Sequence, residues 1–227
     1  MKLFRQLSIL LLSITIFSCQ SIKKSFESRD YDSVISQFLK TNNFDDEELS
    51  MFEKSYKAAF DRDKQQITVL KSLNNGERWE EIFDMYTKIN TRQNSVLRLL
   101  PLHYTNGDEA IIETFNFSSV LEESKQNAAQ YYYDQGVKLL NSGVKSSIRQ
   151  SLDYFAASKK FYINYKDVNE LMDQALAKGK NYVLLIVERN PTLMVPPSFE
   201  QSIVDNVKLT QRDQWVNIDY RRKENVV

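Results

Sequence analysis

Apolar residues recur along most of this chain at the spacing of helices that bury one face. Between Ser25 and Leu100 they repeat every three or four residues, which predicts a series of amphipathic helices. The same spacing returns from Ser119 to Gly179, so we expect two helical blocks. With only 5 glycines and 4 prolines in 227 residues, the chain lacks the many tight turns of an all-β fold. The pattern predicts a mainly α protein.

Local signals divide the first block into separate helices. Four consecutive acids, residues 45–48, precede an apolar helical face. Carboxylates favour the first turn of a helix because its free N–H groups carry a positive partial charge. A calcium loop would need alternating ligands, which are absent, so we interpret the acids as a helix start. Residues 74–76 (Asn-Asn-Gly) predict a helix end, and a short last helix is expected from Val96 to Leu100, before Pro101.

The helical spacing stops between Leu102 and Phe117. This segment contains the turn sequence Asn-Gly-Asp at residues 106–108, followed by alternating apolar and polar residues. We expect a loop or weak hairpin, residues 102–118, that links a helical-repeat block at 19–101 to a second block at 119–179.

The pattern of residues changes after Gly179, and residues 180–227 predict a short α/β segment. Whether this segment is a truncated domain stays open. Tyr182 to Val187 is an apolar, β-branched run typical of a buried strand. Prolines within residues 191–197 interrupt regular structure before an amphipathic helix from Phe199 to Leu209. We expect the first strand to pair with the segment around Trp215 to Tyr220 or to dock on the preceding helices. Alternatively, the strand awaits another chain.

The N-terminus has the layout of a bacterial export signal. Two basic residues precede an apolar run from Leu7 to Phe17, which is too short to span a bilayer. Ile16 to Cys19 resembles the lipobox of bacterial lipoproteins, although Phe17 stands where a small or hydroxyl residue is usual. The resemblance implies that residues 1–18 are a signal peptide and that Cys19 is lipidated, which anchors the mature chain in a bilayer. The alternative is an ordinary signal peptide that contains a cysteine.

The residues after the cysteine bear on where the anchored chain resides. No aspartate follows Cys19, where it would favour retention in the inner membrane of many bacteria. Residues 20–24 also lack the acidic run of a surface-export signal. We therefore expect the outer membrane, with the protein facing the periplasm.

The sequence offers little material for catalysis. Cys19 is the only cysteine and His103 the only histidine, so a catalytic triad or a zinc site has too few candidate residues. No Gly-x-Ser-x-Gly elbow or glycine-rich phosphate loop occurs. After loss of residues 1–18 the chain keeps 28 basic and 30 acidic residues, which does not favour nucleic-acid binding. We expect no catalytic residue, no metal and no cofactor.

Three segments share a bulky residue, an apolar or small residue three positions later, and an aromatic residue four positions beyond it. They are residues 31–38, 79–86 and 148–155. The pattern resembles the second helix of a tetratricopeptide repeat, in which the middle residue lets two helices approach. The middle residues are 48 and 69 positions apart, whereas such repeats recur about every 34 residues. We expect an irregular tetratricopeptide-like array; the alternative is an irregular bundle without repeats.

The region from Ala128 to Gly179 contains Ala-Ala-x-Tyr-Tyr at residues 128–132, Gly136, Leu-Asp-Tyr-Phe at 152–155 and Asn-Tyr-Lys-Asp-Val at 164–168, before a predicted helix and strand. In these motifs, which cover about a quarter of the chain, it resembles repeat-containing envelope lipoproteins of Bacteroidetes-type bacteria. The resemblance implies an architecture and not a reaction. The sequence thus predicts a non-catalytic, lipid-anchored adaptor that binds a protein partner in the cell envelope. The alternative is a lipoprotein that binds a glycan or another small ligand.

Tyrosines of the second block are the candidate binding residues. Three consecutive tyrosines, residues 131–133, point in different directions on a helix, so they cannot all be buried. Exposed tyrosines favour contacts with proteins or sugars. Equally, the rings can fill gaps between packed helices. The predicted partner-binding surface consists of Tyr131, Tyr133, Tyr154, Tyr162 and Tyr165.

Overall fold

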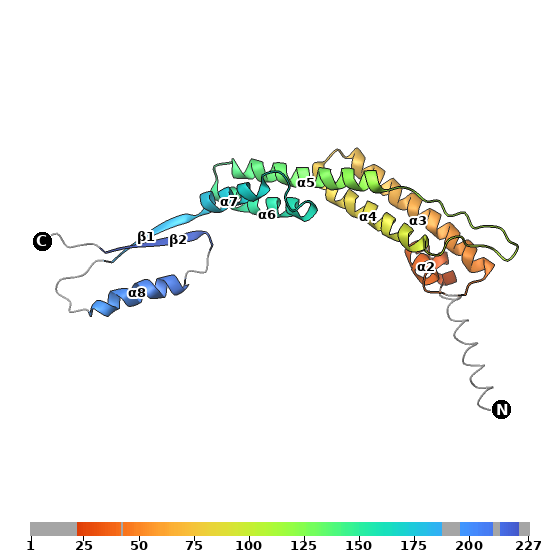
Figure 1. Ribbon diagram of the computed structural model, residues 1–227, viewed down its shortest axis with the longest axis horizontal. Coiled ribbons are helices and arrows are strands. Elements are labelled where there is room, and N and C mark those ends of the chain that lie inside the picture. Colours follow the sequence, from red (N-terminus) through yellow and green to blue (C-terminus); the bar gives the residue numbers. More distant parts are fainter. Residues whose placement is uncertain (1–21, 42, 188–195, 211–213, 223–227) are drawn as a thin grey trace, which may run out of the picture. The chain divides into compact units, whose positions relative to one another are not determined.

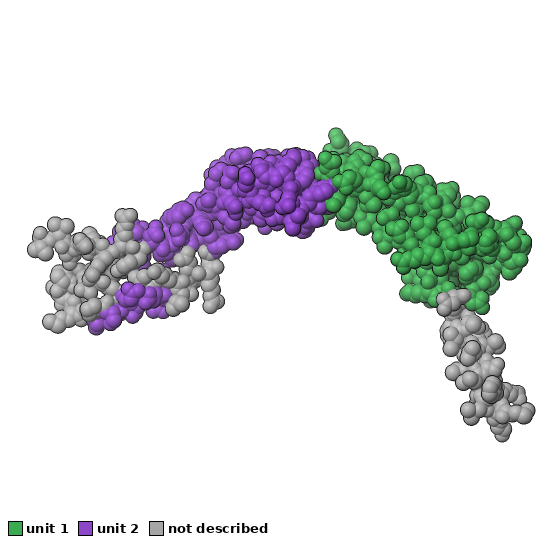
Figure 2. All heavy atoms as spheres, in the orientation of Figure 1, with its two compact units in different colours: residues 1–128 green, residues 129–227 purple. Residues whose placement is uncertain are grey.

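The computed structural model of the chain describes residues 22–41, 43–187, 196–210 and 214–222 (Figure 1). The predicted fold class is confirmed: 68 % of the structure is helical and 7 % is strand, with the strands in a small C-terminal segment. The chain forms two compact units, residues 1–128 and 129–227 (Figure 2). The predicted signal peptide and Cys19 lie outside the described residues.

The first unit is built on three helices, α2 (Tyr31–Phe38), α3 (Asp46–Ser72) and α4 (Trp79–Val96), and residues 22–27 are also helical. Both α2 and α4 pack against α3. As expected, the four acids begin a helix: Asp45 caps α3 and exchanges side-chain and backbone hydrogen bonds with Glu48. A 3-10 turn, η1 (Gly76–Arg78), separates α3 from α4.

Two apolar clusters form the core of this unit. In the first, the fully buried rings of Phe38 and Phe52 stack with their centroids 4.1 Å apart and so join α2 to α3. The second cluster lies between α3 and α4, where Ile67 packs with Ile82 and Ile89. Because each helix contributes one apolar face, the helical periodicity of the sequence accounts for these clusters.

The predicted helix from Val96 to Leu100 is wrong. α4 ends at Val96, and the Leu99 amide donates to the Val96 carbonyl at 2.9 Å, which closes a tight turn. Leu100 precedes Pro101, and a residue before proline avoids the helical region because the proline ring clashes with it. The apolar residues at 97–100 therefore follow α4 as a tight turn and do not continue the helix.

The segment from Leu102 to Phe117 begins with the expected turn, which one isolated antiparallel bridge closes between His103 and Glu109. Its second half is extended and belongs to the core of the first unit, which the sequence did not indicate. Leu102 and Ala110 are buried in the first apolar cluster, and Phe117 is buried in the second. The segment thus closes the core of this unit.

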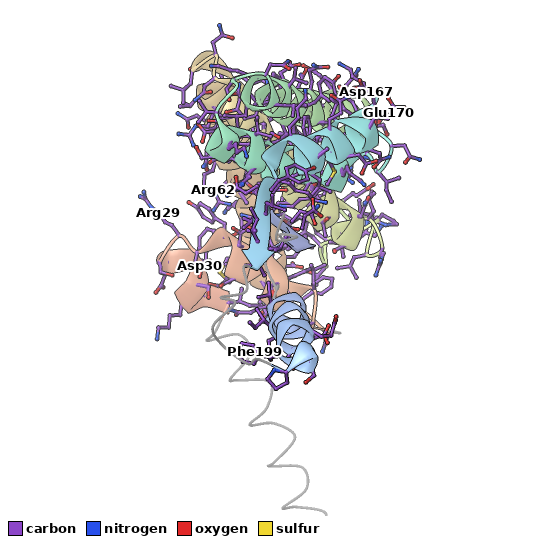
Figure 3. The ribbon with its side chains drawn as sticks, turned by 90° about the vertical axis from the view of Figure 1, so that its left-hand side faces the viewer. Arg29, Asp30, Arg62, Asp167, Glu170 and Phe199 are labelled. Carbon is purple, nitrogen blue, oxygen red and sulfur yellow. The ribbon has the colours of Figure 1, made fainter. Side chains whose placement is uncertain are left out.

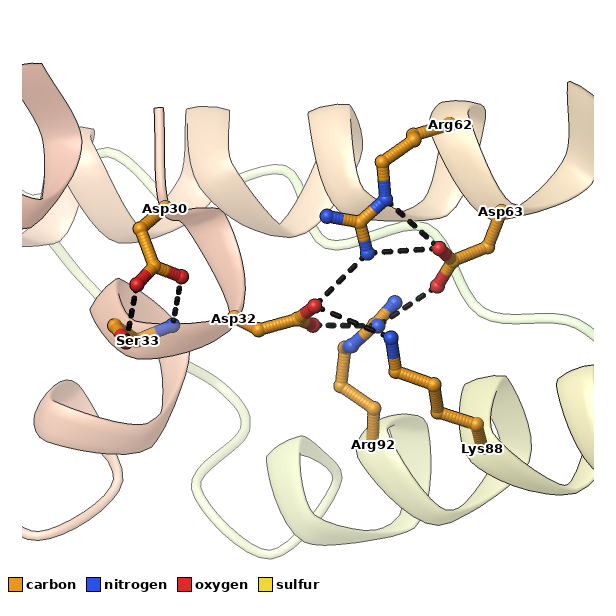
Figure 4. A network of polar contacts seen from close by, with 7 residues as sticks. All are labelled: Asp30, Asp32, Ser33, Arg62, Asp63, Lys88 and Arg92. Carbon is orange, nitrogen blue, oxygen red and sulfur yellow. Dashed lines mark hydrogen bonds and ion pairs between the residues drawn. The ribbon is translucent and has the colours of Figure 1, made fainter. Parts of the chain in front are cut away.

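A network of ion pairs joins α2, α3 and α4 (Figure 4). Arg92 of α4 donates to Asp32 of α2 at 2.6 Å and to Asp63 of α3 at 2.8 Å. Arg62 bonds the same two carboxylates, and Lys88 reaches Asp32 at 3.2 Å. The side chains of Asp63 and Arg92 are only 4 % and 8 % exposed, so neither charge can be left unpaired without a large cost.

The charges of the network act on the carboxyl of Asp32. Burial alone would raise its pKa, but the hydrogen bond from Arg62 and the charges of Arg92 and Lys88 act in the opposite direction and outweigh it. The pKa of Asp32 therefore lies below its ordinary value. The carboxylate stays charged and holds α2 to the two longer helices.

The second unit contains the end of α5 (Ser118–Leu140), α6 (Lys145–Phe161) and α7 (Val168–Gly179). Gly143, with φ of 74°, makes the turn between α5 and α6. A methyl group added at Gly136 would lie 2.6 Å from the ring of Phe155, so the glycine lets α5 approach α6 closely.

The three segments of the repeated pattern lie at or near the starts of α2, α4 and α6. Their middle residues, Val34, Ile82 and Ser151, are all buried, as close helix packing requires. Whether these helices descend from true repeats stays a prediction.

The C-terminal segment forms a βαβ unit: β1 (Asn181–Val187), α8 (Pro197–Thr210) and β2 (Val216–Arg222). The two strands are parallel, and Asn181 pairs with Val216 in a register that runs to the end of both strands. The expected pairing of the first strand with the segment after Trp215 is thus confirmed. The expected burial of this strand is wrong, because most of its large apolar side chains are exposed, with a single neighbouring strand among the described residues. The predicted fraying near residue 227 falls outside the described residues.

The ion-pair network leads to a prediction on stability. Replacing Arg92 with alanine leaves the buried carboxylate of Asp63 with Arg62 alone. We expect the free energy of unfolding of the first unit to fall by about 3 kcal/mol. The measurement is urea unfolding followed by the fluorescence of Trp79 in a Trp215→Phe background. As a control, Lys57→Ala removes an exposed pair with Asp61 and should cost less than about 1 kcal/mol. Equal losses in the two variants would contradict this account.

Candidate functional site

A groove of about 280 Å³ lies on the first unit between α3 and the extended residues 110–117. Its floor is aromatic: the rings of Phe60 and Phe115 stack 4.5 Å apart with their planes within 2° of parallel. Tyr56 also lines the groove, and it is only 5 % exposed. Its hydroxyl has no hydrogen-bond partner in the described parts of the chain. Burial raises the pKa of Tyr56, although the charge of Arg92 opposes this, so the hydroxyl is neutral at physiological pH.

The periodicity of the two walls explains why these residues meet. On α3, Tyr56 and Phe60 are four positions apart and so lie on one face of the helix. On the extended segment, Ile111 and Phe115 line the groove, whereas Ile112 packs against the apolar core. Alternate residues of an extended chain point to opposite sides, which gives this arrangement.

A buried glutamine holds the extended wall in place. The side-chain amide of Gln93, on α4, donates to the Phe115 carbonyl, and its oxygen accepts from the Phe115 N–H, both at 2.8 Å. Gln93 is 6 % exposed. Both hydrogen-bonding groups of this buried side chain therefore bind the backbone of Phe115, as a neighbouring strand would. These two bonds fix the extended wall of the groove at Phe115.

The neighbouring backbone is left without partners. Residues 111–114 make no backbone hydrogen bond to any other described residue. Ile111 is 74 % exposed, so this stretch is open to solvent beside the aromatic floor. An extended backbone with free N–H and C=O groups can pair with another extended chain.

The rim of the groove carries charges of both signs. Lys54 and Glu113 form no ion pair with other described residues, whereas Lys57 lies 3.6 Å from Asp61. Glu53 accepts a hydrogen bond from the Tyr104 hydroxyl at 2.7 Å. Two lysines and two glutamates around the groove balance, so it has no excess charge to attract a simple anion or cation.

The predicted tyrosine surface lies on the second unit, and the structure gathers its residues into two sets of rings. Around Tyr133, the ring of Tyr165 is 5.8 Å away, and Tyr165 lies 5.8 Å from Tyr162. In the other set, Tyr132 lies 5.5 Å from Tyr131 and 6.3 Å from Tyr154. All these rings are half-buried, so each both fills space between helices and keeps an exposed edge.

Polar contacts fix the first of these ring sets. Tyr133 donates to the carboxylate of Asp167 at 2.7 Å, and Tyr165 contacts the side-chain oxygen of Gln130 at 2.8 Å. Asp167, labelled in Figure 3, precedes α7, but its side chain does not cap that helix. The bond to Asp167, together with burial, raises the pKa of Tyr133 to about 12. The ammonium of Lys166 lies 4.6 Å from the centre of the Tyr133 ring.

Other kinds of site find little support in the part of the chain that the structure describes. There, no group of three or more histidine, cysteine, aspartate or glutamate residues is arranged to hold a metal ion. His103 is exposed in the turn that follows Pro101. None of the described helices has the length and apolar character needed to cross a membrane.

Comparisons with known proteins add no relatives. No protein-family model matches this chain, and neither a curated protein nor a solved structure matches it. The geometry of the groove and of the tyrosine surface is therefore the basis for assigning a function.

Sequence reasoning missed the groove. Its two walls are some fifty residues apart, and the spacing of apolar residues gives no sign that residues 110–117 pack beside α3. One signal was available: the alternation around Ile111 to Phe117 indicates an extended segment, although by itself it predicts a loop or weak hairpin and not a wall beside α3.

Proposed function

We propose that this chain is a non-catalytic adaptor that binds an extended segment of a partner protein in the groove of its first unit. One observation carries this proposal: the unpaired backbone of residues 111–114 and the free hydroxyl of Tyr56 lie together beside the stacked rings of Phe60 and Phe115. A peptide satisfies all three features at once.

The backbone of a bound segment would pair with residues 111–114 as an added strand. Main-chain hydrogen bonds of this kind give affinity, and pockets for alternate side chains give specificity. One large apolar side chain of the partner would rest on Phe60 and Phe115, and burial of such a side chain is worth roughly 1.5–3 kcal/mol. A bound segment would cover the hydroxyl of Tyr56, so a polar group of the partner would have to pair with it, because an unpaired hydroxyl is costly to bury.

The charges on the rim favour a peptide over other ligands. Lys54 on α3 suits an acidic residue of the partner, and Glu113 on the opposite wall suits a basic one. A nucleic acid or a lipid headgroup would instead favour a rim of one sign. The proposed ligand is therefore an extended segment with a large apolar residue flanked by opposite charges.

We further propose that the adaptor is a lipoprotein of a bacterial cell envelope, on the outer membrane and facing the periplasm. This rests on the export-signal layout of residues 1–18, on the lipobox-like residues that end at Cys19, and on the resemblance to helical-repeat envelope lipoproteins. The buried middle residues of α2, α4 and α6 agree with that resemblance.

A second candidate function is the binding of a glycan or another small ligand on the tyrosine surface of the second unit. The observation that favours it is the set of half-exposed rings around Tyr133, two of which have the ammonium of Lys166 over their faces. Aromatic faces of this kind stack on sugars. A glycan array would support this function if binding were lost in Tyr133→Ala and kept in groove variants.

Peptide selection tests the groove directly. A phage-displayed library of random twelve-residue peptides, panned against the purified protein, should enrich sequences with one large apolar residue between opposite charges. We expect Ile111→Lys to weaken the selected peptide at least tenfold, because it places a charge beside the apolar floor. Ile111 is 74 % exposed, so the substitution does not disturb the core.

The matched control for that experiment is Val69→Lys. Val69 is also an exposed apolar residue of the first unit, 54 % exposed on α3, but it does not line the groove. Peptide affinity should be unchanged in this variant. If no sequence is enriched, or if both variants bind equally well, the groove is not the binding site.

The anchor has its own test. In cells supplied with labelled palmitate, the wild-type chain should incorporate the label and fractionate with the outer membrane. Cys19→Ala should incorporate none, since the acyl chain has no other cysteine to use. Continued labelling of the variant would show that the lipid assignment is wrong.

A further inference from the structure

The C-terminal sheet suggests a second interaction that the proposed function does not include. β1 carries large apolar side chains on both faces of the sheet, and most of them are uncovered. The exposed fractions are 68 % for Tyr182, 46 % for Val183, 47 % for Leu184 and 51 % for Ile186. A strand that is apolar on both faces is typical of the interior of a parallel sheet and not of its margin.

The register shows that β2 is different. Tyr182 pairs with Asn217 and Leu184 pairs with Asp219, so on this face apolar residues of β1 stand beside polar residues of β2. β2 is therefore built as the outer strand of a sheet. β1 is built as an inner strand, but among the described residues it has a neighbour on one side only.

The backbone of β1 identifies the residues on its open edge. The Asn181 amide donates to the Trp215 carbonyl at 2.6 Å, so the backbone groups of Asn181 point toward β2. In a strand, alternate residues direct their N–H and C=O groups to opposite sides. Tyr182, Leu184 and Ile186 therefore direct theirs to the open edge, and the same residues carry the most exposed face.

Nothing in β1 protects this edge against association. Natural sheets protect open edges with charged residues, prolines or bulges, and the sequence of β1, Asn-Tyr-Val-Leu-Leu-Ile-Val, has no charge and no proline. Contacts at the base of the sheet fix its position on the helices. The guanidinium of Arg149 lies over the ring of Trp215 and donates to the Gly179 carbonyl at 2.9 Å, while Lys145 donates to the Lys180 carbonyl at 2.9 Å.

We propose that the open edge of β1 pairs with the β1 of a second copy of this chain. The two strands run antiparallel around a two-fold axis at Leu184, so that Leu184 faces its own counterpart. Tyr182 then stands opposite Ile186 of the other copy, and the reverse pair forms on the far side of the axis. The product is a continuous four-stranded sheet in the order β2, β1, β1, β2.

Chemistry favours a second copy over an unrelated partner. A strand with no charges meets no like-charge repulsion when it faces itself. The symmetric register places an aromatic side chain opposite a β-branched one on both sides of the axis, which is a favourable cross-strand pair. All three open-edge residues exchange backbone hydrogen bonds with their opposites, because they belong to the hydrogen-bonded class of antiparallel pairs.

Cysteine crosslinking tests this register. In a Cys19→Ala background the chain has no other thiol. Leu184→Cys places two thiols at the axis, where the Cα atoms of an antiparallel hydrogen-bonded pair are about 5.5 Å apart, within the range of a disulfide. Mild oxidation should convert most of this variant to a covalent dimer, and the unoxidised protein should sediment at twice the mass of one chain.

Ile186→Cys is the matched control, on the same face and equally exposed. It faces Tyr182 of the other copy, so alone it should not crosslink, but mixed with Tyr182→Cys it should form the heterodimer. A monomeric mass at micromolar concentration, or equal crosslinking by Leu184→Cys and Ile186→Cys alone, would overturn the proposal. The crosslinked residues lie on the second unit, whereas the groove lies on the first. The outcome of the crosslinking experiment is therefore independent of whether the groove binds a peptide.

Discussion

The first unit depends on the buried pair of Arg92 and Asp63. These two charges are almost completely removed from water, so the helices that carry them must keep one relative position for the pair to stay satisfied. Arg92 is followed on α4 by Gln93, which holds the backbone of Phe115. One short stretch of α4 therefore fixes both the packing of the helices and the wall of the groove.

The cost of leaving polar groups unpaired also explains why the unpaired backbone groups of this chain are informative. Many polar groups that leave water in the described chain find partners: Asp63 has two arginines, and Tyr133 has Asp167. A few do not, such as the hydroxyl of Ser55 and one guanidinium nitrogen of Arg92, which are buried without a hydrogen bond. The backbone of residues 111–114 and the open edge of β1 have no such partner, although each lies beside apolar surface. Leaving these groups unpaired contributes nothing to the fold, and so both proposals assign them to contacts with other chains.

Local sequence patterns predicted the helices and the C-terminal strand pair, because capping residues, turns and apolar spacing are read from neighbouring residues. They also gave the tyrosines of the second unit as candidate binding residues, which stays a prediction. They failed in two places. The end of α4 is a local error, because the residues before Pro101 form a tight turn and not a helix. The groove was missed because it depends on residues some fifty positions apart. β1 was expected to be buried, with a strand that awaits another chain as the alternative, and only the register with β2 shows which of its edges is free.

Residue-resolved amide exchange, measured with and without a selected peptide, tests the groove most directly. In the free protein, the amides of Ala110 and Phe115 should exchange slowly, since both donate hydrogen bonds within the first unit. The amides of residues 111–114 should exchange quickly and become protected when the peptide binds. If these amides are already protected in the free protein, or stay unprotected at saturation, the groove does not bind its partner by strand pairing.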